Sequence, residues 1–121
     1  MAGEALFLGW GQVARGREQL ALEVFQESIA YYAKLQEDGR IERFEAFLLG
    51  PHGGDLAGFI MMYGERSSIN EIQASPDFLR LQARAGSVID NLGVVNAFTG
   101  EALAQRMGVF GEIAAQLPQA K

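Results

Sequence analysis

Residues 41–64 read IERFEAFLLG-PHGGD-LAGFIMMYG, two apolar stretches separated by a short loop. Side chains alternate along residues 41–49, where Arg43, Glu45 and Phe47 share one face and Phe44 lies on the other, as in a β-strand. The loop has the proline and glycines needed to reverse the chain, and residues 56–64 supply a further strand. Two strands joined this closely form an antiparallel hairpin.

Strands and helices alternate on both sides of the hairpin. Residues 5–13 are apolar and aromatic enough for a first strand. Residues 17–38 repeat apolar side chains at three- and four-residue steps, which indicates a helix capped by Gly39. Residues 92–98 predict a fourth strand. Residues 103–117 predict a C-terminal helix with an apolar stripe, terminated by Pro118.

The helix between the third and fourth strands is predicted from local signals. Ser68-Ile-Asn-Glu71 matches a capping box, so the helix is expected to begin there. Ser75-Pro76 offers a second cap, at which the helix bends or restarts. Asn91 or Gly93 is expected to end it. The predicted core face consists of Phe78, Leu79, Leu81 and Val88.

This order predicts an α+β chain of the ferredoxin-like βαββαβ type with an extra C-terminal helix. Right-handed crossovers place the two main helices on one face of a four-stranded antiparallel sheet, with the first and third strands in the middle. Residues 1–121 are expected to form a single domain. The third strand is apolar on both faces, since Phe59 and Met61 oppose Ile60 and Met62. A second copy of the chain is therefore predicted to cover the open face.

The order of elements, the doubly apolar central strands and the stretch from Ile72 to Phe78 resemble the dimeric α/β-barrel superfamily. The strand that ends in Thr99-Gly100 is similar too, and the resemblance spans nearly the whole chain. It implies two ferredoxin-like subunits packed sheet to sheet, with a pocket between sheet and helices or in the barrel interior. The activities it implies are those of cofactor-independent monooxygenases, lactone isomerases and haem-binding relatives. The haem branches present a histidine from a helix, whereas His52 lies in a predicted loop.

Composition excludes several classes of function. The chain has 49% hydrophobic and 21% charged residues, as ordinary globular proteins do. It contains no cysteine and one histidine, which excludes thiolate chemistry and sites built from several histidines of one chain. A net charge of -5 without a basic cluster argues against a nucleic-acid partner. No apolar run reaches the roughly 18 residues of a membrane helix. Without a signal-like N-terminus, a cytoplasmic protein with no membrane partner is expected.

Six side chains form the predicted ligand site, while catalytic residues remain unknown and neither a metal nor a cofactor is expected. Arg43 and Glu45 share a strand face, and Asn96 lies among apolar neighbours. If these faces look into the barrel, Trp10, Gln12 and Tyr63 complete an apolar chamber with a few polar groups. Alternatively, Arg43 and Glu45 pair across the dimer interface or face water on an edge strand, and Asn96 lies in a bulge.

Three further features have competing interpretations. Residues 9–14, GWGQVA, fit a dinucleotide-binding fingerprint, but the hairpin topology disagrees, and Gly9 and Gly11 instead indicate a bulge or a helix that approaches the sheet closely. His52 is interpreted as a loop or dimer-contact residue, with acid–base catalysis as the alternative. Tyr31 and Tyr32 could line a cavity with Trp10, although helical spacing favours core or interface positions.

The sequence thus predicts a homodimer that binds a small apolar or aromatic molecule in a cavity at the sheet. The alternative is a cofactor-independent monooxygenase or isomerase that acts in the same cavity.

Overall fold

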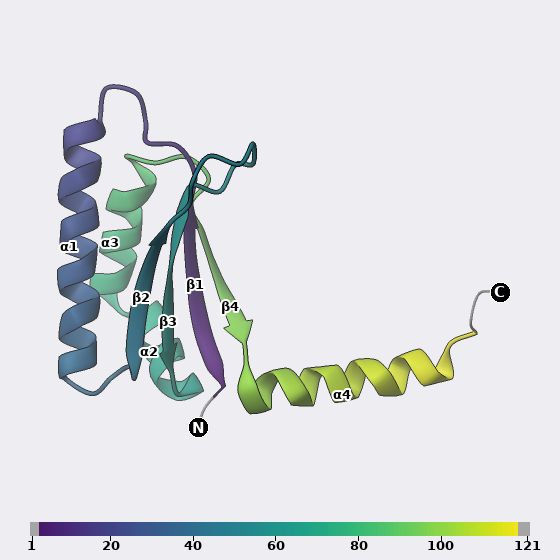
Figure 1. Ribbon diagram of the computed structural model, residues 1–121. Helices are drawn as coiled ribbons and strands as arrows, with labels where there is room; N and C mark the ends of the chain where they lie inside the picture. The colour runs from purple at the N-terminus through teal and green to yellow at the C-terminus, as the bar shows by residue number, and fades with distance from the viewer. Residues whose placement is uncertain (1–2, 119–121) are drawn as a thin grey trace.

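The computed structural model describes residues 3–118. In chain order the elements are β1 (Glu4–Trp10), α1 (Glu18–Glu37), β2 (Arg43–Leu48), β3 (Gly58–Gly64), α2 (Arg66–Ala74), α3 (Pro76–Gly86), β4 (Gly93–Phe98) and α4 (Gly100–Gln116) (Figure 1). The predicted βαββαβ order with a C-terminal helix is confirmed. The helical segment between β3 and β4 consists of two helices, as the second cap suggested.

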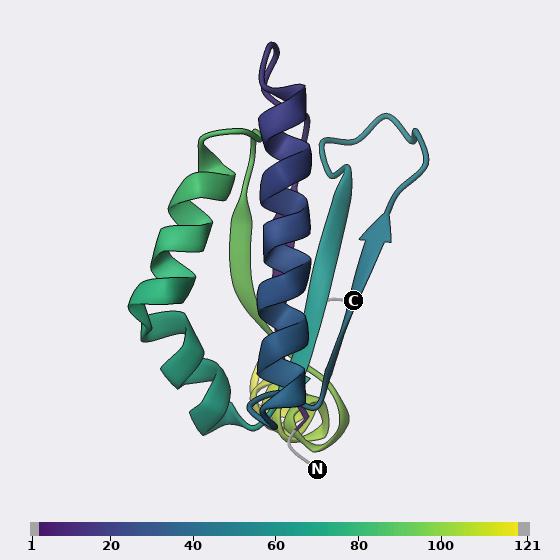
Figure 2. The same cartoon turned by 90° about the vertical axis from the view of Figure 1, so that its left-hand side faces the viewer.

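The four strands form one antiparallel sheet in the order β2-β3-β1-β4. β1 and β3 occupy the middle, as predicted, and Leu8 of β1 lies opposite Ile60 on β3 and Val94 on β4. α1 and α3 lie side by side over one face of this sheet (Figures 1 and 2). The core fills the space between these helices and the sheet. Its most completely buried large side chains are Tyr32, Leu6, Met62, Ile69, Ile72 and Val88.

α1 ends as the sequence predicted. Gly39 has a φ of +76°, in the left-handed region that glycine adopts without a steric penalty. The amide of Arg40 donates to the carbonyl of Leu35 at 2.9 Å, and that of Gly39 donates to Gln36 at 3.0 Å. This pair of hydrogen bonds is the Schellman motif, and it turns the chain toward β2.

The predicted start of the next helix was wrong, whereas its restart is confirmed. α2 begins at Arg66, after the N-cap residue Glu65, so Ser68 lies inside the helix and forms no capping box. The burial of Ile69 and Ile72 decides the position of α2, because packing outweighs a local cap. Ser75 caps α3 by accepting from the amide of Phe78 at 3.3 Å.

The end of that helical segment also differs from the prediction. α3 ends at Gly86, and neither Asn91 nor Gly93 caps it. The hydroxyl of Ser87 donates to the carbonyl of Arg84 at 2.7 Å, which satisfies a free carbonyl of the last turn. Asn91 instead takes a left-handed φ of +57° in the turn before β4. On the predicted core face Leu79 is an exception, because it points to solvent and is 56% exposed.

The second face of the sheet is open. It carries Phe7, Phe47, Phe59, Met61, Tyr63 and Val95, and no element among residues 3–118 covers it. Phe59 stacks on both Phe7 and Phe47, with ring centroids 5.2 and 4.7 Å apart. α4 leaves the end of β4 and extends away from the body on this side (Figure 1). None of the described helices is both long and apolar enough to cross a membrane.

Candidate ligand cavity

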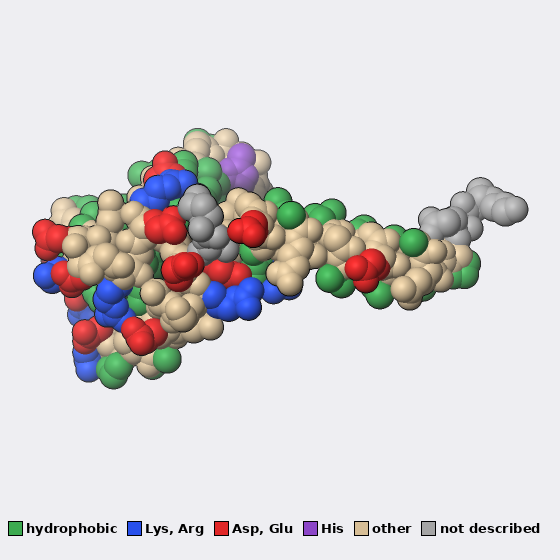
Figure 3. Space-filling view, turned by 90° about the horizontal axis from the view of Figure 1, so that it is seen from below, with side chains coloured by type: hydrophobic (Ala, Val, Ile, Leu, Met, Phe, Trp, Pro, Cys, Tyr) green, Lys and Arg blue, Asp and Glu red, His purple; other side chains and the backbone are tan. Residues whose placement is uncertain are grey.

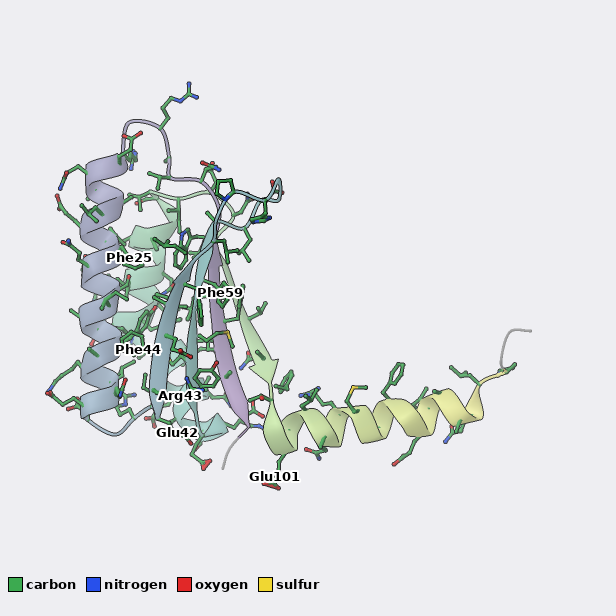
Figure 4. The ribbon with its side chains drawn as sticks, viewed as in Figure 1. Phe25, Glu42, Arg43, Phe44, Phe59 and Glu101 are labelled. Atoms are coloured by element: carbon green, nitrogen blue, oxygen red, sulfur yellow. The ribbon has the colours of Figure 1, made fainter. Side chains whose placement is uncertain are left out.

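A cavity of about 360 Å³ lies between the sheet and the helices α1 and α3. Its apolar wall includes Leu8, Trp10, Val24, Phe25, Ile60 and Val88, and its polar groups come from Glu18, Ser28, Tyr32 and Gln82. Figure 4 shows Phe25 of α1 on the side of the helix that faces the sheet. An apolar chamber with a few polar groups is the usual composition of a small-molecule site.

Small residues leave room for the cavity. Ala21 on α1 and Ala85 on α3 both line it, so neither helix fills the space with a large side chain. On the sheet side, Gly58 of β3 makes room for the indole of Trp10. A Cβ added at Gly58 would lie 2.6 Å from an atom of that ring. The indole in turn packs edge-on against Phe25, with ring centroids 6.0 Å apart.

The polar groups of the cavity have defined partners. The hydroxyl of Ser28 donates to the carbonyl of Val24 at 2.8 Å, and the amide of Gln82 donates to the hydroxyl oxygen of Tyr32 at 3.1 Å. Burial raises the pKa of Tyr32 to about 12, because the charged phenolate is disfavoured away from water. At neutral pH Tyr32 is therefore a protonated phenol. It can donate a hydrogen bond to a ligand, but it cannot act as a base.

Several residues that line the cavity are exposed. Val13, Leu22 and Leu48 are apolar, with Leu48 78% exposed, and Glu18 adds a carboxylate among them. The exposed part of the lining is thus mostly apolar with one acidic group, which suits a molecule with an apolar body.

The sheet divides the six predicted site residues. Trp10 lines the cavity. Gln12 is exposed after the end of β1, and Asn96 is exposed on the edge strand β4, opposite Leu6 and so on the helix side of the sheet. Neither Gln12 nor Asn96 is part of the cavity lining.

Arg43, Glu45 and Tyr63 come together on the open face. The guanidinium of Arg43 lies 2.7 Å from the carboxylate of Glu45 and 3.9 Å from the centre of the Tyr63 ring. The hydrogen bond to Glu45 raises the pKa of Arg43. This cluster is separated from the cavity by the thickness of the sheet, because the two lie on opposite faces.

Sequence reasoning missed three of the cavity's polar residues, Glu18, Ser28 and Gln82. Ser28 interrupts the apolar stripe of α1 four residues after Val24, and this buried polar position was a usable signal. Gln82 could not be found, because only the packing of α3 against α1 brings it to Tyr32, 50 residues away. Tyr32 belongs to the core and also lines the cavity. Its interpretation as a core residue and its interpretation as a cavity residue are therefore both correct.

His52 braces the β2–β3 loop. One ring nitrogen, Nε2, lies 2.7 Å from the carbonyl oxygen of Leu56, and the amide of Gly54 donates to Nδ1 at 3.2 Å. A neutral ring with its proton on Nε2 satisfies both contacts. Among residues 3–118, no three histidine, aspartate or glutamate side chains gather as a metal site.

The glycine pattern at residues 9–14 has a packing explanation. The antiparallel sheet lacks the parallel strands of dinucleotide-binding folds. A Cβ at Gly9 would lie 2.5 Å from the Phe7 ring, and one at Gly11 would lie 2.9 Å from the carbonyl oxygen of Asp55. Gly11 thus allows the close approach of the β2–β3 loop, and Gly9 leaves room for the Phe7 ring. Neither contact is the close approach of a helix to the sheet that the alternative interpretation included.

A four-stranded antiparallel sheet in this strand order, with helices on one face, is the ferredoxin-like fold. No protein-family model matches the chain, and no curated protein matches it significantly.

Several solved structures share this fold. A hypothetical protein of Arabidopsis thaliana superposes with a TM-score of 0.62 at 14% identity, over 84% of this chain and 91% of its own. A dimeric ferredoxin-like protein of unknown function from Bacteroides fragilis gives 0.57 at 10% identity, over 79% and 96%. SnoaB, a cofactor-independent oxygenase from Streptomyces nogalater, gives 0.55 at 17% identity, over 83% and 95%. They confirm the predicted ferredoxin-like fold.

Proposed function

We propose that this chain forms a homodimer whose sheets face each other, and that each protomer binds a small apolar or aromatic molecule in its cavity. The observation that carries the proposal is the cavity of about 360 Å³ with its mostly apolar walls and few polar groups. The open apolar sheet face and the dimeric ferredoxin-like structures from Bacteroides fragilis and Jannaschia support the dimer.

The dimer gives the remaining predicted site residues a place. With two sheets packed together, Arg43, Glu45 and Tyr63 face the barrel interior and supply a paired charge there. We keep Trp10 as the candidate contact of the cavity ligand, Arg43, Glu45 and Tyr63 as candidate contacts of a molecule in the barrel interior, and Gln12 and Asn96 as candidates nearer the surface. We also propose that residues 1–121 act as one domain and that the protein is cytoplasmic, without a nucleic-acid or membrane partner.

The alternative proposal is a cofactor-independent monooxygenase or isomerase acting in the same cavity. SnoaB shares the fold, but one fold hosts many functions, and the site determines the chemistry. We prefer binding because the mostly apolar lining of the cavity supports the capture of an apolar molecule, whereas a shared fold does not by itself support a reaction. The neutral phenol of Tyr32 can orient such a ligand by donating a hydrogen bond.

Titration calorimetry with 2-naphthol, a neutral aromatic alcohol, tests the binding proposal. Ala85→Phe places a ring in the cavity, whereas Ala83→Phe makes the same change on the exposed side of α3. We expect wild type and Ala83→Phe to bind the probe and Ala85→Phe to lose at least about tenfold in affinity. Equal binding by a folded Ala85→Phe variant, or no binding by wild type, would overturn the proposal.

Oxygen uptake tests the alternative. If the cavity catalyses oxidation, 1,4-naphthohydroquinone should consume oxygen faster with wild type than without protein. Ala85→Phe should abolish that excess rate, and Ala83→Phe should keep it. An unchanged rate in the presence of wild type would contradict the oxygenase with this substrate and leave binding as the favoured function.

A further inference from the structure

α4 presents an apolar face that the described part of its own chain leaves exposed. Leu103, Met107, Val109, Phe110 and Ile113 are each 47–66% exposed, and Ala102 is the only buried residue among the described residues of the helix. At about 100° per residue these side chains fall on one broad face. Figure 3 shows hydrophobic side chains along the projecting helix.

Such a helix needs a partner to be stable. It has 17 residues and includes Gly100, Gly108 and Gly111, which lower its intrinsic helix stability. Isolated helices of about 15 residues are marginal in water even with better sequences. The exposed apolar face must therefore pack against another surface.

The root of α4 fixes the direction of the helix. The amide of Thr99 donates to the carbonyl of Gly3 at 2.8 Å, and a Cβ at Gly3 would lie 2.4 Å from the Thr99 oxygen. The guanidinium of Arg106 stacks 3.5 Å from the centre of the Phe98 ring. These contacts fix where α4 begins, next to Gly3 and the end of β4, and from there the helix extends away from its own subunit (Figure 1).

This direction brings the apolar face beside the open sheet. Glu101 points away from the angle between α4 and the sheet (Figure 4). Phe110 follows nine residues later, which at about 100° per residue places it on the opposite side of the helix, toward that angle. The open sheet face and the apolar face of α4 thus border the same space. A second protein that packs on the open sheet face therefore also contacts the apolar face of α4.

We propose that α4 is exchanged between two copies of this chain, each helix packing its apolar face on the partner subunit. The inference rests on the proposed homodimer and extends it to the C-terminal helix. At about 1.5 Å per residue the 17 residues span about 25 Å, whereas packed sheets lie about 10 Å apart. α4 is therefore long enough to reach past the partner's sheet to its helix layer. Because the dimer is two-fold symmetric, each subunit packs its own α4 on the partner and receives the partner's α4 in return.

Amide hydrogen exchange and sedimentation test this exchange. In wild type we expect the amides of residues 103–113 to be protected at concentrations where the dimer forms and to lose that protection on dilution to monomer. Phe110→Asp should weaken the dimer at least about tenfold in Kd. Ala115→Asp, on the opposite and exposed side of α4, should leave it unchanged. Protection of α4 that does not depend on concentration would overturn the inference.

The two proposals fail in different ways. If Phe59→Asp on the sheet face abolishes the dimer while Phe110→Asp does not weaken it, the homodimer stands and helix exchange is wrong. If wild type is a monomer at high concentration, both are wrong. If both variants weaken the dimer and Ala115→Asp does not, both are supported.

Discussion

Tyr32 shows how one residue combines packing with a polar role. Its side chain is 1% exposed, yet its hydroxyl accepts from Gln82 and borders the cavity. Because a buried phenolate is unfavourable, the folded protein holds the phenol proton more tightly than the unfolded chain does. This residue therefore links the stability of the core to pH.

Stability should fall in alkali through Tyr32. Its pKa is about 12 in the folded protein against an ordinary 10.0, so its contribution is complete below pH 10 and is lost as the pH rises toward 12. The free energy of unfolding should drop by about 2 kcal/mol more in wild type than in Tyr32→Phe across this interval. Lys34, whose pKa is raised by Asp38, titrates in both proteins and cancels in the comparison. Urea unfolding at each pH measures this free energy. If it fell equally with pH in wild type and in Tyr32→Phe, the raised pKa of Tyr32 would be contradicted.

Glu4 is a buried carboxylate that depends on one partner. It is 5% exposed, and Nε and Nη2 of Arg66 donate to it at 3.2 and 3.0 Å. Arg66→Met should destabilise the protein by about 1–3 kcal/mol, because it leaves a buried charge without its partner. Arg80→Met removes an exposed pair with Asp77 and should cost less than about 0.5 kcal/mol. Urea unfolding checks both, and equal losses would contradict the difference in burial.

At the scale of elements, local signals and packing compete for helix ends. Ser68 and Ser75 both have the sequence context of a cap, but only Ser75 accepts a hydrogen bond from a helix amide. Ile69 and Ile72 bury the inner face of α2, which fixes the helix one turn earlier than the cap at Ser68 would allow. A single sequence cannot weigh such burial against a cap.

The two serines therefore make a matched pair. Ser75→Ala should cost about 1 kcal/mol of stability, because the amide of Phe78 loses its acceptor. Ser68→Ala lies inside α2 and should be neutral or slightly stabilising, since alanine is the better helix former. Thermal unfolding followed by circular dichroism measures both. If Ser68→Ala lost more stability than Ser75→Ala, Ser68 would be the capping residue after all.

At the scale of the whole molecule, the sheet has one face covered by helices and one that no element between residues 3 and 118 covers. Phe59 lies at the centre of the open face, stacked between Phe7 and Phe47. Exposed aromatic clusters of this kind mark interaction sites. The same property, a strand apolar on both faces, led from the sequence to the expectation of a second copy.

The sheet face gives a direct prediction of assembly. Phe59→Asp should convert the dimer to monomer, because the charge would be buried between two apolar sheets. Leu79→Asp places the same charge on the exposed outer side of α3 and should remain a dimer. Sedimentation equilibrium distinguishes them. A dimeric, folded Phe59→Asp would show that this face is not the interface.

The sequence alone determined the order of elements, the strand faces, the cap at Ser75 and the end of α1 at Gly39. These follow from periodicity and backbone preferences, which act between neighbouring residues and are visible in one chain. Alternation also placed Arg43 and Glu45 on one face of their strand, but it did not show that this face and that of Trp10 lie on opposite sides of the sheet.

Only the tertiary structure decided where the cavity lies and which side chains share it. Ser28, Tyr32 and Gln82 meet because α1 and α3 pack side by side, and the sheet separates them from Arg43, Glu45 and Tyr63. Which sheet face the helices cover, and where α4 points, depend on contacts between residues far apart in the chain. Periodicity assigns a residue to a face, but only packing decides what that face meets.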